Sequence, residues 1–284
     1  FIGGGALLDL ELQQFYYAIG IPMFQGYGLT EASPVISSNT PVSHKLGSSG
    51  KLVKDLQVKI LDEQGQVCAT GIKGEIVVSG KNVMSGYWKN PEATKSTIRE
   101  GWLCTGDLGY VDKDGFLYVL GRYKSLLIGN DGEKYSPEGI EEAIVDFSSF
   151  IDQCMLYNNQ NAYTSALLAV NPVALQTHLK KHGMQKDDEE GMRESIRIVY
   201  GEIERFAKHS DEEQSFPRRW MPAAIAILQE PFTEDNGMIN STLKMVRPKV
   251  IKHYASRLEF LYTPSGKDPF NEKNIAAIRQ VLNN

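Results

Sequence analysis

The most constraining feature of this sequence is a block of short strand patterns that lies between two regions of helical periodicity. Between residues 49 and 122, β-branched and aromatic residues alternate in three runs, which predicts strands at 56–61, 74–79 and 116–120. Residues 63–66 and 112–115 have the composition of turns, and a helix is expected to start near Pro91. We therefore expect a small antiparallel barrel or sandwich in this region.

The flanking regions mix helices with buried strands. Residues 6–19 have near-helical apolar spacing, and 22–25 are expected to form a short strand that leads into a polar loop ending near Ser49. After Arg122 the same criteria predict helices at 137–147, 172–181, 192–208 and 248–254, and strands at 151–157, 165–170 and 223–228. The acidic run from Asp187 to Glu190 is expected to be a solvated loop, and 274–282 a surface helix. The chain is thus predicted to be an α/β and α+β multidomain protein with a boundary at 121–125.

The composition argues against several classes of function. The net charge is −5 and no dense basic stripe occurs, which disfavours binding to nucleic acid. No run approaches 18 apolar residues, so no segment is expected to span a bilayer. The cysteines number three and are widely spaced, which fits neither a disulfide framework nor a zinc site and favours a reducing, cytoplasmic setting.

The segment from Phe24 to Glu31 (FQGYGLTE) combines groups that suit a bound nucleotide. Its glycines allow the backbone to approach a flat ligand closely, and Tyr27 offers a ring for stacking. Thr30 can donate to a phosphoryl oxygen, and Glu31 supplies a carboxylate of the kind that Mg²⁺ prefers. The alternative is a strand-to-helix turn with Thr30 as the N-cap.

Asp107, in the sequence Thr-Gly-Asp, is the second candidate, together with the Arg122 that follows Gly121. A carboxylate can accept two hydrogen bonds from the vicinal hydroxyls of a ribose, and an arginine can donate to the same sugar or its phosphate. The alternative is a turn aspartate that pairs with a nearby arginine.

Two later segments add candidates of a different kind. The glycine-containing loop 126–137 either approaches a ligand or is a hairpin loop, with Ser136 as N-cap and Pro137 as the first residue of a helix. Lys244 follows a glycine-led segment and could neutralise charge that develops on a carboxyl or phosphoryl oxygen. By itself, a lysine at such a position is more often solvated.

Taken together and in this order, the Gly-Tyr-Gly-Leu-Thr-Glu, Thr-Gly-Asp and Gly-Arg elements and the late lysine resemble the adenylate-forming (AMP-binding) superfamily. The resemblance implies that Tyr27 stacks on adenine, that Thr30 contacts the α-phosphate and that Glu31 holds Mg²⁺. The other roles that it implies fall on an adenine pocket (Gly4, Gly5 and Ala6), a further AMP- or ATP-binding residue (Gly28), a ribose site (Asp107 and Arg122), a catalytic lysine (Lys244, acting with Thr30 and Glu31), a hinge (Lys124) and a thioesterification loop (Gly129, Gly132 and Lys134).

Within this superfamily, residues 236–244 (NGMINSTLK) resemble the corresponding segment of bacterial long-chain fatty acyl-CoA ligases. The resemblance implies an acid–thiol ligase that uses ATP, Mg²⁺, a fatty acid and coenzyme A. Its domains would be the end of an α/β nucleotide-binding core (1–45), a β-barrel-like subdomain (46–122) and a mobile α+β domain (123–284). That last domain would contain a helical insertion at about 184–215 and a tail at about 257–284.

The sequence departs from the family pattern in one important respect. The Gly/Ser/Thr-rich loop that clamps the ATP phosphates in this family does not occur in the 284 residues. We therefore expect this chain by itself to be inactive in adenylation. The alternatives are a residual AMP-binding module without turnover and an adenylation domain for an amino or aryl acid. The expected location is cytoplasmic, with peripheral association at the inner membrane surface left open.

Overall fold

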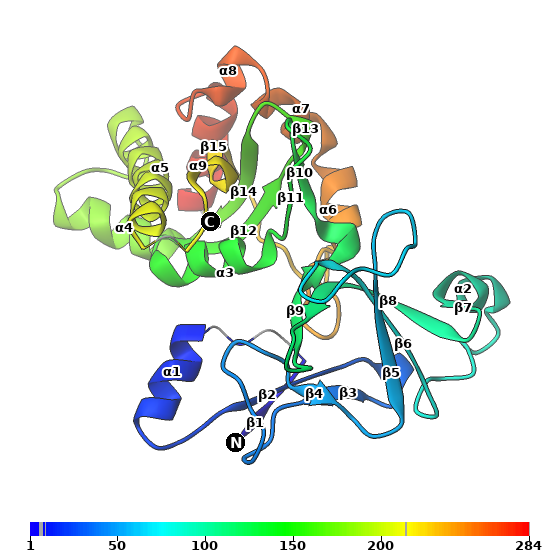
Figure 1. Ribbon diagram of the computed structural model, residues 1–284. Coiled ribbons are helices and arrows are strands. Elements are labelled where there is room, and N and C mark those ends of the chain that lie inside the picture. Colours follow the sequence, from blue (N-terminus) through cyan, green and yellow to red (C-terminus); the bar gives the residue numbers. More distant parts are fainter. Residues whose placement is uncertain (6–7, 9, 214, 284) are drawn as a thin grey trace. The chain divides into compact units, whose positions relative to one another are not determined.

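The chain divides into two compact units, Phe1–Lys124 and Ser125–Asn284, and both combine sheets with helices (Figure 1). The computed structural model describes residues 1–5, 8, 10–213 and 215–283. Mixed α and β structure was predicted and is present. The three-part division of the chain and the barrel-like character of 46–122 stay predictions.

The described residues of the first unit form two sheets. In one, β1 (Ile2–Gly3) pairs in parallel with β2 (Phe24–Gly28), and antiparallel pairing continues through β3 (Val35–Ser38) to β4 (Lys51–Leu52). The other is antiparallel in the order β5–β6–β8–β7, with β9 also on β8; its strands are β5 (Leu56–Leu61), β6 (Gly74–Gly80), β7 (Ile98–Arg99), β8 (Trp102–Val111) and β9 (Leu117–Arg122). The described helical segments are α1 (Leu10–Ala18), α2 (Pro91–Thr97) and the short 3₁₀ turn η1 (Thr30–Ala32), and a further 3₁₀ turn, η2 (Tyr123–Ser125), spans the boundary to the second unit.

A single core joins the two sheets of this unit. Ile36 of β3 is buried together with Ile76 of β6 and Leu103 of β8. Strand β8 buries every second residue from Leu103 to Gly109, as expected for a strand with one face on a core. The polar loop predicted up to Ser49 was wrong in part, because residues 35–38 form β3 and pair with strands on both sides.

Helix α1 has an unusual distribution of polarity. Its one buried side chain is Gln13, whose amide donates to the backbone carbonyl of Leu8 at 2.7 Å. Most of its large apolar side chains, by contrast, are exposed: Leu10, Leu12, Phe15 and Tyr17. An apolar stripe normally faces a core, so the apolar periodicity that correctly predicted a helix here does not mark its buried face.

The second unit is built around a three-stranded sheet in the order β12 (Ile151–Tyr157), β14 (Thr164–Val170), β15 (Pro222–Ile227). A smaller sheet contains β10 (Leu127–Gly129), β11 (Lys134–Tyr135) and β13 (Asn159–Asn161). The helical segments are α3 (Glu138–Phe147), α4 (Pro172–Lys181), α5 (Glu189–Glu212), η3 (Arg218–Trp220), α6 (Arg247–His253), α7 (Ala255–Leu261), α8 (Pro264–Lys267) and α9 (Glu272–Asn283).

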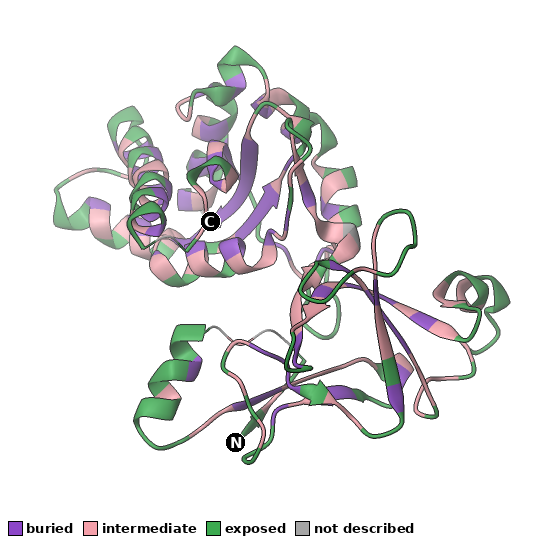
Figure 2. Ribbon diagram, viewed as in Figure 1, coloured by how far each residue is buried: buried purple, intermediate pink, exposed green. Residues whose placement is uncertain are grey.

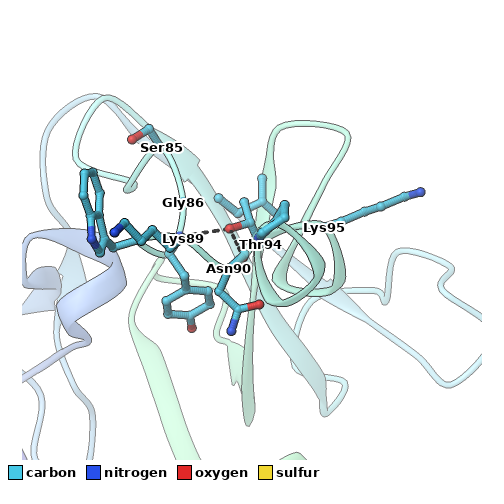
Figure 3. Close-up of a pocket in the computed structure, with 10 residues that line it drawn as sticks. Ser85, Gly86, Lys89, Asn90, Thr94 and Lys95 are labelled. Atoms are coloured by element: carbon cyan, nitrogen blue, oxygen red, sulfur yellow. Dashed lines mark hydrogen bonds between the residues drawn. The ribbon is translucent and has the colours of Figure 1, made fainter.

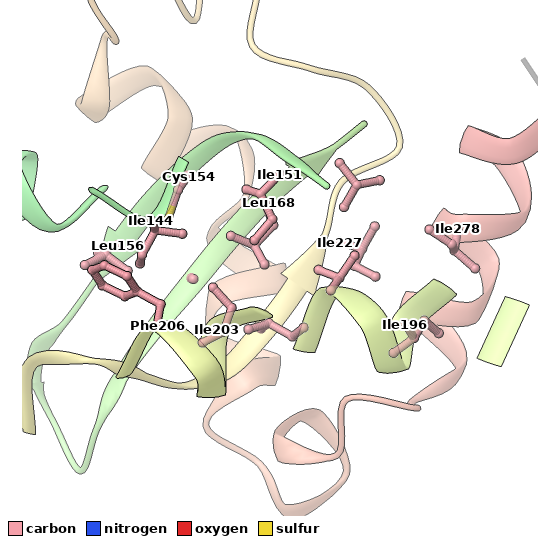
Figure 4. Packing of buried hydrophobic residues seen from close by; sticks show 14 of the residues in the cluster. Ile144, Ile151, Cys154, Leu156, Leu168, Ile196, Ile203, Phe206, Ile227 and Ile278 are labelled. Carbon is pink, nitrogen blue, oxygen red and sulfur yellow. The ribbon is translucent and has the colours of Figure 1, made fainter. Parts of the chain in front are cut away.

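Helices cover both faces of the central sheet, and β14 is buried along its whole length (Figure 2). Because side chains alternate between the faces of a strand, Leu168 packs with α3, α4, α5 and α9, whereas Leu167 packs with α6 and α7. The first cluster is the larger, and Ile144, Ile196 and Ile278 bring three helices onto it (Figure 4).

Two expectations for this unit were wrong in whole or in part. The acidic run is exposed, as expected, but only Asp187 and Asp188 precede the helix: Asp188 caps α5 by accepting from the Gly191 N–H at 2.8 Å, and Glu189 and Glu190 form the first turn. An acidic first turn complements the helix dipole. The helix predicted at 274–282 is α9, which has one exposed face and buries Ile278 in the core on the other. Ser136 does not cap α3, because Pro137 stands at the cap position and makes no side-chain cap bond.

Candidate functional site

The first unit brings Tyr27, Asp107 and Arg122 together from three different strands. The Tyr27 hydroxyl donates to Oδ2 of Asp107 at 2.5 Å, and Nη1 of Arg122 lies 3.1 Å from Oδ1 of the same carboxylate. The side chain of Asp107 is only 8% exposed, whereas that of Arg122 is 52% exposed. One buried carboxylate therefore has a phenol on one oxygen and a solvent-accessible guanidinium on the other.

The pairing of β8 with β9 explains why Asp107 and Arg122 meet, since they are direct partners across the antiparallel ladder. Thr105 organises the same place: its hydroxyl donates to the Ile76 carbonyl at 2.7 Å and accepts from the Asp107 N–H at 3.1 Å. Its carbonyl accepts from Nη1 of Arg122 at 3.1 Å. Gly106, between them, has φ of 71°, a left-handed conformation that favours glycine.

The environment of Tyr27 keeps its hydroxyl protonated. Burial raises the pKa of Tyr27 well above the ordinary tyrosine value, and the negative charge of Asp107 adds to the increase. The phenol is therefore a hydrogen-bond donor at neutral pH, and the aspartate is its acceptor. The ring of Tyr27 packs against the core shared by the two sheets, so its predicted role of stacking on adenine stays a prediction.

Thr30 and Glu31 lie in η1, directly after β2. Thr30 is exposed and begins the 3₁₀ turn, while the cap position is taken by Leu29 without a side-chain cap bond. The alternative in which Thr30 is an N-cap is therefore wrong. A side chain at Gly28 would overlap the Pro34 carbonyl oxygen, with its Cβ 1.8 Å away, so this glycine permits the close turn from β2 into η1 and β3.

Glu31 fits a magnesium ion that also binds nucleotide phosphates. Mg²⁺ is usually held by one or two carboxylates together with substrate phosphates and water. Glu31 is half-buried and adjoins the exposed Thr30. In the part of the chain that the structure describes, no three His, Cys, Asp or Glu side chains form a group able to hold a metal. A single carboxylate beside an exposed threonine suits a metal that is bound together with phosphates.

The predicted adenine pocket is described only in part. Gly4 follows β1, and a Cβ placed there would lie 3.8 Å from the Gly26 carbonyl of the neighbouring strand. Gly5 has φ of 89°. Ala6 lies outside the described residues, so the pocket itself stays a prediction.

The predicted thioesterification loop is a tight hairpin between β10 and β11. Gly129 and Gly132 close its turn, in which the Gly132 N–H donates to the Gly129 carbonyl at 3.0 Å, and Lys134 is exposed on β11. Glu133 ties this hairpin to η3: it accepts from Nε and Nη2 of Arg219, each at 2.6 Å, and from Nε1 of Trp220 at 3.0 Å. The role of this loop, and that of Lys124 as a hinge next to the boundary of the two units, stay predictions.

Lys244 belongs to the second unit and lies in a short loop that Asn240 organises. The Asn240 side-chain oxygen accepts from the N–H groups of Thr242 and Lys244 at 3.0 and 2.9 Å. The Asn240 N–H donates to the Lys244 carbonyl at 2.9 Å, and Ile239 bridges Met245. The backbone at Lys244 is thus held on both sides while its side chain is exposed.

A buried ion pair anchors the end of this loop. Arg247, three residues after Lys244, pairs through Nη2 with Oε2 of Glu141 on α3 and donates through Nη1 to the Leu156 carbonyl at 3.1 Å. Glu141 also accepts from the Leu156 N–H at 2.6 Å. Burial raises the pKa of Glu141, and the adjacent Arg247 opposes that increase. The loop with Lys244 is therefore attached to the central sheet and to α3.

Several residues that shape these sites were not predicted from the sequence. Thr105 could have been noticed, because it is the threonine of the Thr-Gly-Asp sequence that contains Asp107. The Tyr87 hydroxyl contacts Glu31, which is 56 positions away in the sequence. Glu133 pairs with Arg219, which is 86 positions away. No local sequence pattern indicates such pairs.

Comparison with known proteins gives consistent relatives. Residues 1–88 match the family model described as AMP-binding enzyme. The chain is 34% identical over 276 residues to the probable acyl-activating enzyme 16, chloroplastic, of Arabidopsis thaliana, a match that covers 92% of this chain and 37% of that protein. It is 30% identical over 261 residues to the long-chain-fatty-acid–CoA ligase FadD15 of Mycobacterium bovis, with 92% and 41% covered.

A solved structure shows the same relation. The O-succinylbenzoate coenzyme A synthetase of Bacillus subtilis, in complex with AMP, is similar with a TM-score of 0.63 and 28% identity, and the match covers 87% of this chain and 44% of that one. The chain spans 37% and 41% of the lengths of the two curated relatives.

Proposed function

This chain belongs to the AMP-binding enzyme superfamily, of whose members it covers a part and whose long-chain-fatty-acid–CoA ligases are among its homologues, and from that premise we propose that it binds the adenosine part of a nucleotide. The observation that carries the proposal is that Tyr27 of β2 and Arg122 of β9 both contact the carboxylate of Asp107 on β8. The carboxylate of Asp107 is of the kind that accepts hydrogen bonds from ribose hydroxyls, and the exposed Arg122 is suited to the ribose or its phosphate.

The proposed reaction of the whole enzyme is acid activation followed by thiol transfer. ATP and a carboxylic acid would form an acyl-adenylate and pyrophosphate, and coenzyme A would then accept the acyl group. Glu31 would hold the Mg²⁺ that neutralises phosphate charge, and Thr30 would contact the α-phosphate. Lys244 would neutralise charge on the reacting carboxyl and phosphoryl oxygens, which is the kind of electrostatic help that often dominates catalysis.

The proposed change between the two half-reactions is a rotation at Lys124. The rotation would move Lys244 away from the nucleotide site and bring in the hairpin that contains Gly129, Gly132 and Lys134. Domain movements of this kind are known to gate the successive steps of an enzyme. The rigid attachment of both segments within the second unit supports this idea, because each can then move as part of one body.

We propose a long-chain fatty acid as the substrate, on the strength of the similarity to long-chain-fatty-acid–CoA ligases. The second candidate is an aryl acid, which the similarity to O-succinylbenzoate coenzyme A synthetase favours. We also propose that the 284 residues alone bind AMP without catalysing ATP–pyrophosphate exchange, because they contain no phosphate-clamping loop.

A cytoplasmic location is proposed as well. Cys68, Cys104 and Cys154 are free thiols, which supports a reducing compartment. Among the described residues, no helix has the length and apolar character needed to cross a membrane. Peripheral association with the inner membrane surface is left to experiment.

The test is calorimetric titration of the chain with AMP. Asp107→Asn keeps the shape of the side chain but removes its charge, and we expect a loss of about 10- to 100-fold in affinity, the size of a hydrogen bond to a charged group. Arg99→Ala, which removes an exposed arginine of the same unit, should leave the affinity unchanged. Absence of AMP binding by the unaltered chain, or equal affinities of the chain and Asp107→Asn, would contradict the proposal.

A further inference from the structure

The carboxylate of Glu31 has a partner on one of its two oxygens. The Tyr87 hydroxyl donates to Oε1 of Glu31 at 2.7 Å. The residue also makes a backbone contact in the same region, since the Met84 N–H donates to the Glu31 carbonyl at 2.8 Å. Asn82 adds a third link, because its side-chain amide donates to the Ala32 carbonyl at 2.9 Å. The turn η1 is thus fastened to the segment that follows β6.

The position of Tyr87 is itself determined by the start of α2. Its N–H donates to Oγ1 of Thr94 at 2.9 Å, and its carbonyl accepts from the Asn90 N–H at 3.2 Å. Gly86, Asn90 and Thr94 lie close together at this end of the helix (Figure 3). A Cβ at Gly86 would come within 2.7 Å of Thr94, so the loop can approach the helix this closely only with glycine. The phenol is therefore carried by a segment with few alternative conformations.

Metal ions differ in the coordination geometry that they require from a carboxylate. Mg²⁺ requires near-octahedral geometry at about 2.0–2.1 Å, whereas Ca²⁺ accepts six to eight oxygens at about 2.3–2.6 Å and often takes both oxygens of one carboxylate. A hydrogen bond from a fixed phenol occupies one oxygen and orients the group, as partners outside the metal's own ligands generally do.

We propose that Tyr87 is a positioning residue that reserves Oε1 of Glu31, presents only Oε2 to a cation and so makes the site prefer Mg²⁺ to Ca²⁺. This inference rests on the proposed function, in which Glu31 holds the metal that accompanies a nucleotide. It extends that function from the identity of the ligand to the origin of ion selectivity, and it assigns a role to a residue 56 positions away from the carboxylate.

The test measures the ATP affinity of the full chain by calorimetry in EDTA, in Mg²⁺ and in Ca²⁺. In the unaltered chain we expect Mg²⁺ to raise the affinity more than Ca²⁺ does. In Tyr87→Phe the gain from Mg²⁺ should fall about tenfold, the lower end of the effect seen when such partners of metal ligands are removed. The gain from Ca²⁺ should fall less or rise, because both carboxylate oxygens become available, and the affinity in EDTA should not change.

Two further variants serve as controls. Tyr110→Phe removes a hydroxyl from the stacked pair of Tyr110 and Tyr118 in the same unit and should preserve the ratio of the Mg²⁺ gain to the Ca²⁺ gain. Thr94→Val removes the hydroxyl that holds the Tyr87 backbone but retains the phenol, so the ratio should fall by a smaller amount. A general loss of structure would also lower the ATP affinity in EDTA. The ratio of the Mg²⁺ gain to the Ca²⁺ gain does not depend on the affinity in EDTA, so it separates the two effects.

The possible outcomes separate this inference from the proposed function. Normal ATP binding with the same ratio in Tyr87→Phe and the unaltered chain would overturn the inference and leave the proposed function intact. Failure of the unaltered chain to bind ATP in any of the three solutions would overturn both. A reduced ratio in Tyr87→Phe and an unchanged ratio in Tyr110→Phe would support the assignment.

Discussion

A single carboxylate, that of Asp107, receives a hydrogen bond from Tyr27 and an ion pair from Arg122. The two contacts depend on pH in different ways. Arginine stays charged throughout the accessible range, whereas the phenol can ionise. Because burial and the adjacent aspartate raise the pKa of Tyr27, the folded protein holds the phenolic proton more tightly than the unfolded chain does.

This difference predicts an alkaline loss of stability. A group whose pKa is raised by folding stabilises the fold fully below its unfolded pKa, about 10 for tyrosine, and loses that contribution as the pH rises further. Urea unfolding followed by the fluorescence of Trp88 and Trp102 should show Tyr27→Phe to be less stable by about 1.5–3 kcal/mol at pH 8. The difference should shrink between pH 10 and 11, and a pH-independent difference would refute the assigned protonation state.

The buried pair of Glu141 and Arg247 leads to a second prediction for single residues. Glu141→Leu should reduce the free energy of unfolding of the second unit by about 3–5 kcal/mol, because Arg247 would remain buried without a counter-charge. The double variant Glu141→Leu/Arg247→Leu should recover much of that loss, since an apolar pair avoids the desolvation cost of both charges. Denaturation monitored by Trp220 measures both, and additive losses in the double variant would argue against a coupled pair.

At the scale of whole elements, α9 shows how a helix that is amphipathic in sequence acquires a role in the core. Its Asn274 side chain accepts from the Ile227 N–H at 2.9 Å and donates to the Ile225 carbonyl at 3.1 Å. These bonds pair one N–H and one carbonyl group on the edge of β15, which is the last strand of its sheet. Ile278, on the same face of the helix, enters the large cluster.

We therefore predict that α9 is essential for the stability of the second unit. Ile278→Ala should cost about 2–5 kcal/mol, as truncation of a fully buried isoleucine does. Arg279→Ala changes the next residue, which is exposed, and should change the stability by no more than about 0.5 kcal/mol. Thermal unfolding of both variants checks this. Equal effects would mean that Ile278 does not lie in the core in solution.

At the scale of the whole molecule, the division into Phe1–Lys124 and Ser125–Asn284 separates the predicted nucleotide site from the predicted catalytic lysine. Tyr27, Asp107 and Arg122 belong to the first unit, and Lys244 belongs to the second. A ligand that binds only the first unit can stabilise only that unit directly.

Scanning calorimetry with AMP should reveal this separation. We expect two unfolding transitions, and AMP at 100 times its Kd should stabilise the first unit by about 2.7 kcal/mol. The transition of the second unit, identified by the fluorescence of Trp220, should not move. In Asp107→Asn the same AMP concentration should stabilise the first unit by only about 0.4–1.4 kcal/mol, because the weaker affinity brings it to about 1 to 10 times the Kd. A single transition that moves as a whole with AMP would show instead that the two units unfold cooperatively.

Much of the local structure could be predicted because it depends on neighbouring residues. The strand 56–61 and the helix 172–181 were predicted with the bounds that the structure has, since apolar alternation and an Asn-Pro start are strong local signals. The ten-residue strand β8 was missed, because its glycines and its Thr-Gly-Asp sequence have the composition of a turn. Only pairing with strands on both sides makes it a strand.

By itself, the sequence determined which chemical groups are available and in which order they occur: an aromatic ring and a carboxylate near residue 30, Asp107 and Arg122 across one hairpin, and a late lysine. Tertiary structure alone decided which groups share a contact. Tyr27 reaches Asp107 across 80 positions and Tyr87 reaches Glu31 across 56. The physical reason is that such contacts depend on strand register and on the burial of whole faces, and these are properties of the packed sheets that no window of neighbouring residues contains.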